Sequence, residues 1–165
     1  MTYFRELQPS WNNPLAWLAL APAGIGSYAI LQIAKTAGSR TPYSAVLSAA
    51  ASLCLALWIF SIRLDTDVEQ AGLRLRFRFL WPTRQISYEA IARAEAVEYE
   101  PIKNYGGWGL RRGKHDGRAE WVWSISGRRG VRLHFHDGET FLLGSRRPEE
   151  LAAAINTRIS AVHVA

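Results

Sequence analysis

The chain of 165 residues has about the length of one domain, and its 20 Lys and Arg against 14 Asp and Glu give a net charge of +6. Its single cysteine, Cys54, excludes an internal disulfide and a cysteine-based metal cage. The isoelectric point near 9.9 predicts attraction to anionic surfaces, without choosing between phospholipid and nucleic acid.

Charged residues are distributed unevenly along the chain. Residues 15–62 carry only two of them, Lys35 and Arg40, whereas the chain beyond that range holds 17 Lys and Arg against 13 Asp and Glu. We therefore predict a membrane hairpin over residues 1–62 and a separate folded domain over residues 63–165.

Two uncharged runs of twenty residues, 15–34 and 43–62, predict membrane-spanning helices. At a rise of about 1.5 Å per residue, each run spans roughly 30 Å, the thickness of the hydrocarbon core of a bilayer. Amphipathic aromatic rings favour the membrane interface, and such residues cluster near the ends of both runs. These residues are Trp11, Trp17, Tyr43, Trp58 and Phe60.

Two alternatives remain open for these runs. Both could be buried helices of a soluble bundle, although length without charge favours the membrane interpretation. The first could also be a cleaved signal peptide with residues 21–23 as the cleavage site. Against this, Glu6 offsets Arg5 and the apolar stretch before the site is short.

Positive charges on the two sides of the hairpin predict its orientation. The short link between the runs offers Lys35 and Arg40, whereas the other side offers Arg5, Arg63 and the arginines of residues 74–78. The positive-inside rule then predicts a multi-pass protein of the bacterial inner membrane, with both termini and the C-terminal domain in the cytoplasm.

Beyond the apolar part the hydrophobic period changes to two, which predicts half-buried antiparallel strands. In residues 73–80 Leu and Phe alternate with Arg, so one face of the strand carries Arg74, Arg76 and Arg78. Trp121 and Trp123 share a face of a later strand and are expected to point inward. Other strands are predicted at 63–69, 84–88, 92–98, 108–111, 120–125, 130–135 and 140–143.

The last segment predicts an amphipathic helix. Pro148 and the acidic pair Glu149 and Glu150 suit a first helical turn, and Leu151 begins an apolar stripe that recurs every fourth residue. About seven short strands with such a helix are the plan of a pleckstrin-homology-like (PH-like) domain. The predicted fold class is therefore α+β: an N-terminal transmembrane helical hairpin, then a PH-like antiparallel β-barrel or sandwich capped by a C-terminal helix.

Several short motifs carry a resemblance to a known group of proteins. They are FRELQ at 4–8, GGWGLR at 106–111, GV at 130–131, DG at 137–138, LGS at 143–145 and PEEL at 148–151. Their order and spacing resemble a group of functionally uncharacterised small bacterial membrane proteins with two N-terminal transmembrane helices and a PH-like domain. The resemblance covers nearly the whole chain and implies architecture and membrane location, without an activity. It does not extend to Trp121, Trp123 or the pair at 128–129.

The three arginines of residues 73–80 are one candidate binding surface. At about 3.4 Å per residue they form a ridge roughly 14 Å long, near enough to the predicted helix to meet anionic headgroups. Each basic residue near such a surface contributes about 1 kcal/mol. The competing interpretation is a solvated strand face on which Asp65, Asp67 and Glu69 pair across strands with the arginines.

The stretch YGGWGLRRG, residues 105–113, is the second candidate surface. Trp108, Arg111 and Arg112 are its candidate residues for binding a partner or an anionic surface. The stretch lacks the Lys and Ser or Thr of a P-loop, and we predict no helix after its glycines. A turn that allows close approach of two strands is therefore the favoured interpretation.

Catalysis is not predicted, because the carboxylates alternate along exposed faces and no polar pocket is indicated. His134 and His136, followed by Asp137, could bind zinc, but spacing fixes no third ligand. Nucleic-acid binding is disfavoured by the predicted tethering at a bilayer and by the inward tryptophans.

The predicted function is a membrane-anchored binding or scaffold module that is not an enzyme and needs no cofactor. Its ligand is a partner protein or the anionic membrane surface. The expected partners are the lipid bilayer, a membrane protein, a second copy of the chain and anionic lipid. The alternatives are an enzyme or metal-binding protein that uses His134 and His136, and a nucleic-acid-binding module.

Overall fold

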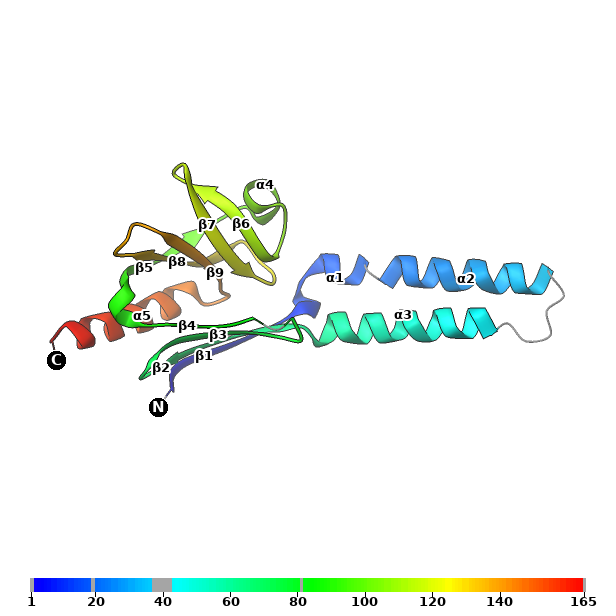
Figure 1. The fold of residues 1–165 in the computed structure, drawn as a ribbon, viewed down its shortest axis with the longest axis horizontal. Helices are drawn as coiled ribbons and strands as arrows, with labels where there is room; N and C mark the ends of the chain where they lie inside the picture. The colour runs from blue at the N-terminus through cyan, green and yellow to red at the C-terminus, as the bar shows by residue number, and fades with distance from the viewer. Residues whose placement is uncertain (1, 19, 37–42, 81, 165) are drawn as a thin grey trace. The chain divides into compact units, whose positions relative to one another are not determined.

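A computed structural model describes the chain except for residues 1, 19, 37–42, 81 and 165 (Figure 1). The chain forms two compact units. The helical unit comprises Pro9–Ile62, and the β unit joins Met1–Gln8 to Arg63–Ala165.

The helical unit consists of the 3-10 helix η1 and three α-helices, of which α2 and α3 lie side by side (Figure 1). Ser10 fixes η1 to the end of α3: its N–H donates to the carbonyl of Ile62 at 3.0 Å and its hydroxyl to that of Ile59 at 2.6 Å. Trp17 packs edge-on against Phe60, with ring centroids 4.8 Å apart. The bounds are Ser10–Asn12 for η1, Pro14–Leu18 for α1, Leu20–Thr36 for α2 and Tyr43–Ser61 for α3.

The prediction of an N-terminal transmembrane hairpin is wrong. The first described residues, Thr2–Pro9, form strand β1 of a sheet rather than leading into a helix. Over the described residues no helix combines the length and the hydropathy that crossing a membrane requires. The 17 residues of α2 and the 19 of α3 span only roughly 26 Å and 28 Å.

The prediction of a multi-pass protein in the bacterial inner membrane rested on those two spans, and the same finding corrects it. Arg40, which contributed to the predicted orientation, lies outside the described residues. Large apolar side chains of α2 and α3 are nevertheless exposed, and contiguous exposed apolar surface is typical of interaction sites. They include Ile25, Tyr28, Ile33, Val46, Leu47, Leu53, Leu55 and Leu57.

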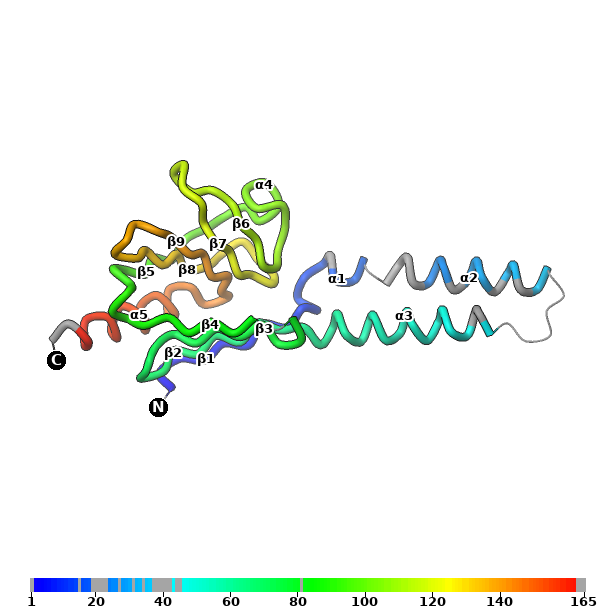
Figure 2. Tube along the Cα trace, viewed as in Figure 1, coloured from blue at the N-terminus to red at the C-terminus, as the bar shows by residue number. Residues whose placement is uncertain are grey.

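The first sheet of the β unit has four strands in the order β1-β2-β3-β4. Strands β2, Arg63–Glu69, and β3, Gly72–Arg78, are antiparallel, as are β3 and β4, Thr83–Ile86. Figure 2 shows β1 from the start of the chain running beside β2. The inner face is apolar because the strands alternate with period two; it carries Leu64, Val68, Leu73, Leu75 and Phe77.

The second sheet has five strands in the order β5-β8-β9-β7-β6. Strands β7 and β9 are parallel, whereas the other neighbours are antiparallel, so the predicted wholly antiparallel barrel or sandwich is wrong. The parallel pair arises because β8 does not lie next to β7. The chain leaves β7, forms β8 with one strand position left between the two, and returns through the β8-β9 hairpin, so that β9 lies between them and runs parallel to β7. The bounds are Ile91–Glu98, Gly109–His115, Arg118–Ser124, Arg129–Phe135 and Thr140–Gly144 for β5 to β9.

Aromatic residues from both sheets form the centre of the β unit. Phe77 of β3 meets Trp123 of β7 edge-on at a centroid distance of 5.9 Å, and Trp123 lies 5.7 Å from Phe141 of β9. Trp123 is therefore buried, as predicted. Trp121 is 46% exposed, so the prediction that both tryptophans point inward is wrong for Trp121.

The C-terminal helix α5, Pro148–Val164, packs against the edge strand β5. A register shift between Ile91 and Arg93 interrupts the ladder of β5. Asn156 of α5 satisfies the backbone there, because its side chain accepts from the N–H of Ala94 at 2.9 Å and donates to the carbonyl of Ala94 at 2.8 Å. The helix thereby protects an edge that could otherwise pair with another chain.

Strand β1 is held by the loop that precedes α5. Buried Glu6 accepts from the hydroxyl of Ser145 at 2.6 Å and from the N–H of Arg146 at 2.7 Å. The buried side chain of Gln8 donates to the carbonyl of Gly144 at 2.7 Å. The motifs at 4–8 and 143–145, which lie far apart in the sequence, are therefore in direct contact.

Candidate binding site

The YGGWGLRRG stretch begins at the last residue of a short helix, α4, and its first glycine caps that helix. Helix α4 spans Pro101–Tyr105 and ends at Gly106, whose φ of 71° lies in the left-handed region that favours glycine. The N–H of Gly106 donates to the carbonyl of Ile102 at 3.0 Å, and that of Gly107 to the carbonyl of Pro101 at 2.9 Å. The glycines therefore end a helix that we did not predict.

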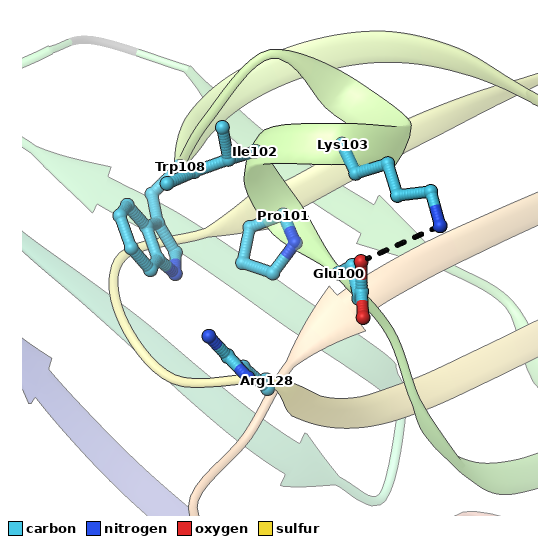
Figure 3. Close-up of a pocket in the computed structure, with 6 residues that line it drawn as sticks. All are labelled: Glu100, Pro101, Ile102, Lys103, Trp108 and Arg128. Carbon is cyan, nitrogen blue, oxygen red and sulfur yellow. Dashed lines mark ion pairs between the residues drawn. The ribbon is translucent and has the colours of Figure 1, made fainter.

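A pocket of about 200 Å³ lies beside α4 (Figure 3). Its walls combine apolar and charged side chains: Glu100, Pro101, Ile102, Lys103, Trp108 and Arg128. Ile102 is 64% exposed and adds apolar surface to the rim of the pocket. The indole N–H of Trp108 donates to the carbonyl of Gly127 at 2.8 Å, so this ring has a fixed orientation. We name this feature the α4 pocket.

The charges of the α4 pocket are unequally satisfied. Lys103 lies 3.9 Å from the carboxylate of Glu100, a long ion pair between two exposed side chains. In the described part of the chain, Arg128 has no carboxylate within ion-pair distance, whereas the next residue, Arg129, pairs with Glu149. Figure 3 shows the side chain of Arg128 directed toward the wall formed by Trp108.

The backbone around Arg128 is fixed, although its side chain pairs with no carboxylate among the residues that the structure describes. Its carbonyl accepts a hydrogen bond of 2.8 Å from the N–H of Tyr99, and the adjacent Gly127 accepts the bond from Trp108. The guanidinium is therefore attached to an ordered loop, which reduces the conformational entropy lost on binding.

Tyr105, Glu120 and Arg132 form a buried hydrogen-bonded triad that holds α4 against the five-stranded sheet. The carboxylate of Glu120, which is 0% exposed, accepts from the hydroxyl of Tyr105 at 2.7 Å and from Nε of Arg132 at 2.8 Å. Burial, together with the neighbouring carboxylate, raises the pKa of Tyr105 to about 12. The ring of Tyr105 lies over Gly113, where a Cβ would come within 2.2 Å of a ring carbon. Tyr105 therefore locks α4 onto β6 and β7.

The structure separates the predicted residues of this stretch. Trp108 lines the α4 pocket, and Nε of Arg111 donates to the carbonyl of Trp108 at 3.2 Å. Arg112 instead extends over the exposed ring of Trp121, 5.6 Å from its centroid. Because the two arginines alternate along β6, only Arg111 contacts the residues at the α4 pocket. The proposed binding roles of these residues stay predictions.

The arginine ridge lies among carboxylates, which agrees with the competing interpretation of a solvated face. Arg74 lies 3.4 Å from Glu69, and Arg78 lies 3.6 Å from Asp65. Arg76 has no carboxylate within ion-pair distance among the described residues. Binding of an anionic surface by the ridge stays a prediction.

The histidine pair is divided between a strand and a turn. Strand β8 ends at Phe135, so His134 lies in the sheet and His136 in the turn that follows. His134 lies 3.3 Å from Glu95, and burial with the nearby charge of Arg93 lowers its pKa. Among the described residues no group of three His, Cys, Asp or Glu could hold a metal ion.

Sequence reasoning missed five of the six residues that line the α4 pocket: Glu100, Pro101, Ile102, Lys103 and Arg128. A signal for α4 was present, because Pro101 after a strand and Gly106 five residues later are typical helix start and stop residues. No local pattern indicates Arg128, which reaches the pocket from the loop between β7 and β8.

Comparison of the sequence with models of known protein families finds no match. Comparison with curated proteins finds none either. The resemblance to small bacterial membrane proteins therefore stays a prediction, and the functional argument depends on the residues themselves.

Proposed function

We propose that the protein is a binding module that recognises a segment of a partner protein, with the α4 pocket as its site. The segment carries a carboxylate next to an apolar side chain. The observation that carries this proposal is Arg128, a guanidinium on a fixed loop with no acidic partner in the described chain, beside an apolar wall.

The composition of the α4 pocket supports a protein ligand. Trp and Arg are the residues that most often dominate the binding energy of protein interfaces, and exposed Ile102 adds apolar area next to them. A planar guanidinium binds a carboxylate through two parallel hydrogen bonds. Glu100, which pairs with Lys103, repels negative charge. It therefore disfavours a bound segment with a second acidic group close to the carboxylate that Arg128 binds.

The test is a titration of the ¹⁵N-labelled full chain, followed through the indole N–H resonance of Trp108, which a Trp108→Phe variant identifies. The probe is the peptide acetyl-Ala-Leu-Glu-Leu-Ala-amide, and its matched control has Gln in place of Glu. We expect the Glu peptide to shift the Trp108 resonance and to bind about tenfold more tightly than the Gln peptide, a difference of about 1.4 kcal/mol.

The variant Arg128→Gln should remove the preference for the Glu peptide. Lys114→Gln is the matched control, because it removes the same charge from an exposed residue outside the α4 pocket. If Arg128→Gln and Lys114→Gln weaken the Glu peptide equally, the attraction is a general effect of net charge and the proposed site is wrong. The same conclusion follows if neither peptide moves the Trp108 resonance.

A further inference from the structure

The turn between β3 and β4 presents a strained and exposed aromatic residue. Phe79 has a φ of 64°, in the left-handed region that a residue with a Cβ rarely adopts, and it is 61% exposed. Among the described residues the other such non-glycine residue is Asp116, a type that tolerates this region better. Backbone strain at an exposed residue suggests a position held for function rather than for the core.

The geometry of the turn places Phe79 at the tip of the sheet. The N–H of Phe77 donates to the carbonyl of Pro82 at 3.0 Å, and Arg76 lies opposite Thr83 in the last pair of the ladder. Phe79 therefore lies beyond the last hydrogen-bonded pair. The surface next to it is an open depression of about 510 Å³ rather than an enclosed pocket.

Positive charge is concentrated at this end of the sheet. Two arginines share one carboxylate there, since Arg63 lies 3.2 Å and Arg78 lies 3.6 Å from Asp65. Arg76, a third arginine at this end, has no carboxylate within ion-pair distance among the described residues. The register places Arg63 opposite Arg78 and Asp65 opposite Arg76, so these four groups lie together.

The other end of the same sheet face is neutral. Arg5 pairs with Asp67 at 2.6 Å, and Arg74 pairs with Glu69 at 3.4 Å. The excess of two positive charges therefore lies at the end that carries Phe79. Arginines alternate along the whole strand, so alternation alone does not explain why only this end has an excess of positive charge.

We propose that this end of the four-stranded sheet docks on an anionic lipid surface. Phe79 enters the headgroup layer, and Arg63, Arg76 and Arg78 contact the phosphates around it. A protruding aromatic ring among basic residues suits an interface that supplies negative charge without a fixed shape. A protein partner would need a shaped surface, and the depression beside Phe79 is open. This docking involves the surface of the bilayer only and is independent of the α4 pocket.

The experiment uses the full chain with Cys54→Ser, which removes the only native thiol. A nitroxide label is attached at Phe79→Cys and, as a control, at Glu89→Cys, an exposed position of the 3-10 helix η2, Tyr88–Ala90. Vesicles contain either phosphatidylcholine alone or three parts phosphatidylcholine to one part phosphatidylglycerol. Collisions with oxygen, which is enriched in the bilayer, and with a water-soluble nickel complex report the depth of each label separately. If another part of the chain binds the vesicle, the label at position 79 stays in water.

With phosphatidylglycerol vesicles, the label at position 79 should gain collisions with oxygen and lose them with nickel, while the label at 89 stays in water. Arg76→Gln, with Phe79 intact, should lower the partition coefficient onto these vesicles about fivefold, and Arg74→Gln at the neutral end should lower it less. The proposal is overturned if the label at position 79 still collides with nickel when the protein is bound to vesicles, which is the result expected of a surface that docks on protein instead. It is also overturned if Arg76→Gln and Arg74→Gln lower the partition coefficient equally.

Discussion

The substitution Tyr105→Phe tests the support of the α4 pocket most specifically. It removes one hydroxyl and keeps the ring that packs over Gly113. The carboxylate of Glu120 is fully buried and would lose the 2.7 Å bond from Tyr105, retaining only Arg132. Because a hydrogen bond to a charged group contributes about 1.5–3 kcal/mol, we expect the free energy of unfolding at pH 7 to fall by that amount.

The raised pKa of Tyr105 also predicts how the free energy of unfolding changes with pH. Burial and Glu120 raise the pKa of Tyr105 to about 12 from the value of 10.0 for an exposed tyrosine. The folded chain therefore holds this proton more tightly than the unfolded chain. Its contribution to stability is complete below pH 10 and is lost as the pH rises from 10 toward 12. The loss amounts to about 2–3 kcal/mol.

Tyr88 and Tyr99 contribute to the alkaline loss as well, because burial raises the pKa of both phenols, that of Tyr88 to about 12. Tyr105→Phe should therefore remove part of the alkaline loss of stability and leave the rest. The assay is urea unfolding followed by far-ultraviolet circular dichroism at pH 7, 10 and 11.5. Tyr3→Phe, at an exposed position of β1, is the control and should change neither quantity. A Tyr105→Phe variant with wild-type stability and the full alkaline loss would refute the buried triad.

Three further substitutions test contacts that hold the β unit together, one of them beneath the α4 pocket. Gly113→Ala places a methyl group against the ring of Tyr105 and should destabilise the chain by about 1–3 kcal/mol in urea unfolding. Asn156→Ala removes both hydrogen bonds to the backbone of Ala94, and thermal unfolding should show a loss of about 1–3 kcal/mol. Glu6→Gln replaces one of two accepting oxygens by a donor, and amide hydrogen exchange in β1 should accelerate about tenfold or more.

Each of these substitutions has a matched comparison. Gly24→Ala adds the same methyl group where no atom lies within 4 Å, and should not destabilise. Asn156→Asp keeps the acceptor for the N–H of Ala94 but turns a second oxygen toward the carbonyl of Ala94, so it should not retain wild-type stability. For β1, faster exchange that extends uniformly through β5 to β9 would indicate global unfolding and would contradict the local role of Glu6.

The strands of the β unit follow closely from local pattern. Alternation in residues 73–80 predicts β3 and its face of arginines, because period two is a local property of an extended chain. The pairing of strands is non-local, so the sequence does not indicate that β9 runs parallel to β7. The predicted fold class failed at the same level, since strand β1 is held by β2 and by the loop before α5, and both lie far from it in the sequence.

The prediction of the candidate site failed for a related reason. The glycines at 106 and 107 were expected to form a turn between strands, because the helix before them has only five residues and no hydrophobic period. Trp108 was found as a conspicuous aromatic residue in a glycine-rich stretch. Arg128 could not be found, because its place beside Trp108 depends on how the loop after β7 folds back.

In our proposal the α4 pocket binds an acidic segment of a partner protein, and crosslinking at its rim tests this directly. Ile102, which is 64% exposed, is replaced by the photoreactive benzoylphenylalanine in the full chain, produced in its native cells. We predict one dominant crosslinked partner, with Asp or Glu next to an apolar residue at the crosslinked position, and loss of that product in Arg128→Gln but not in Lys114→Gln. A product that persists unchanged in Arg128→Gln would contradict the claim.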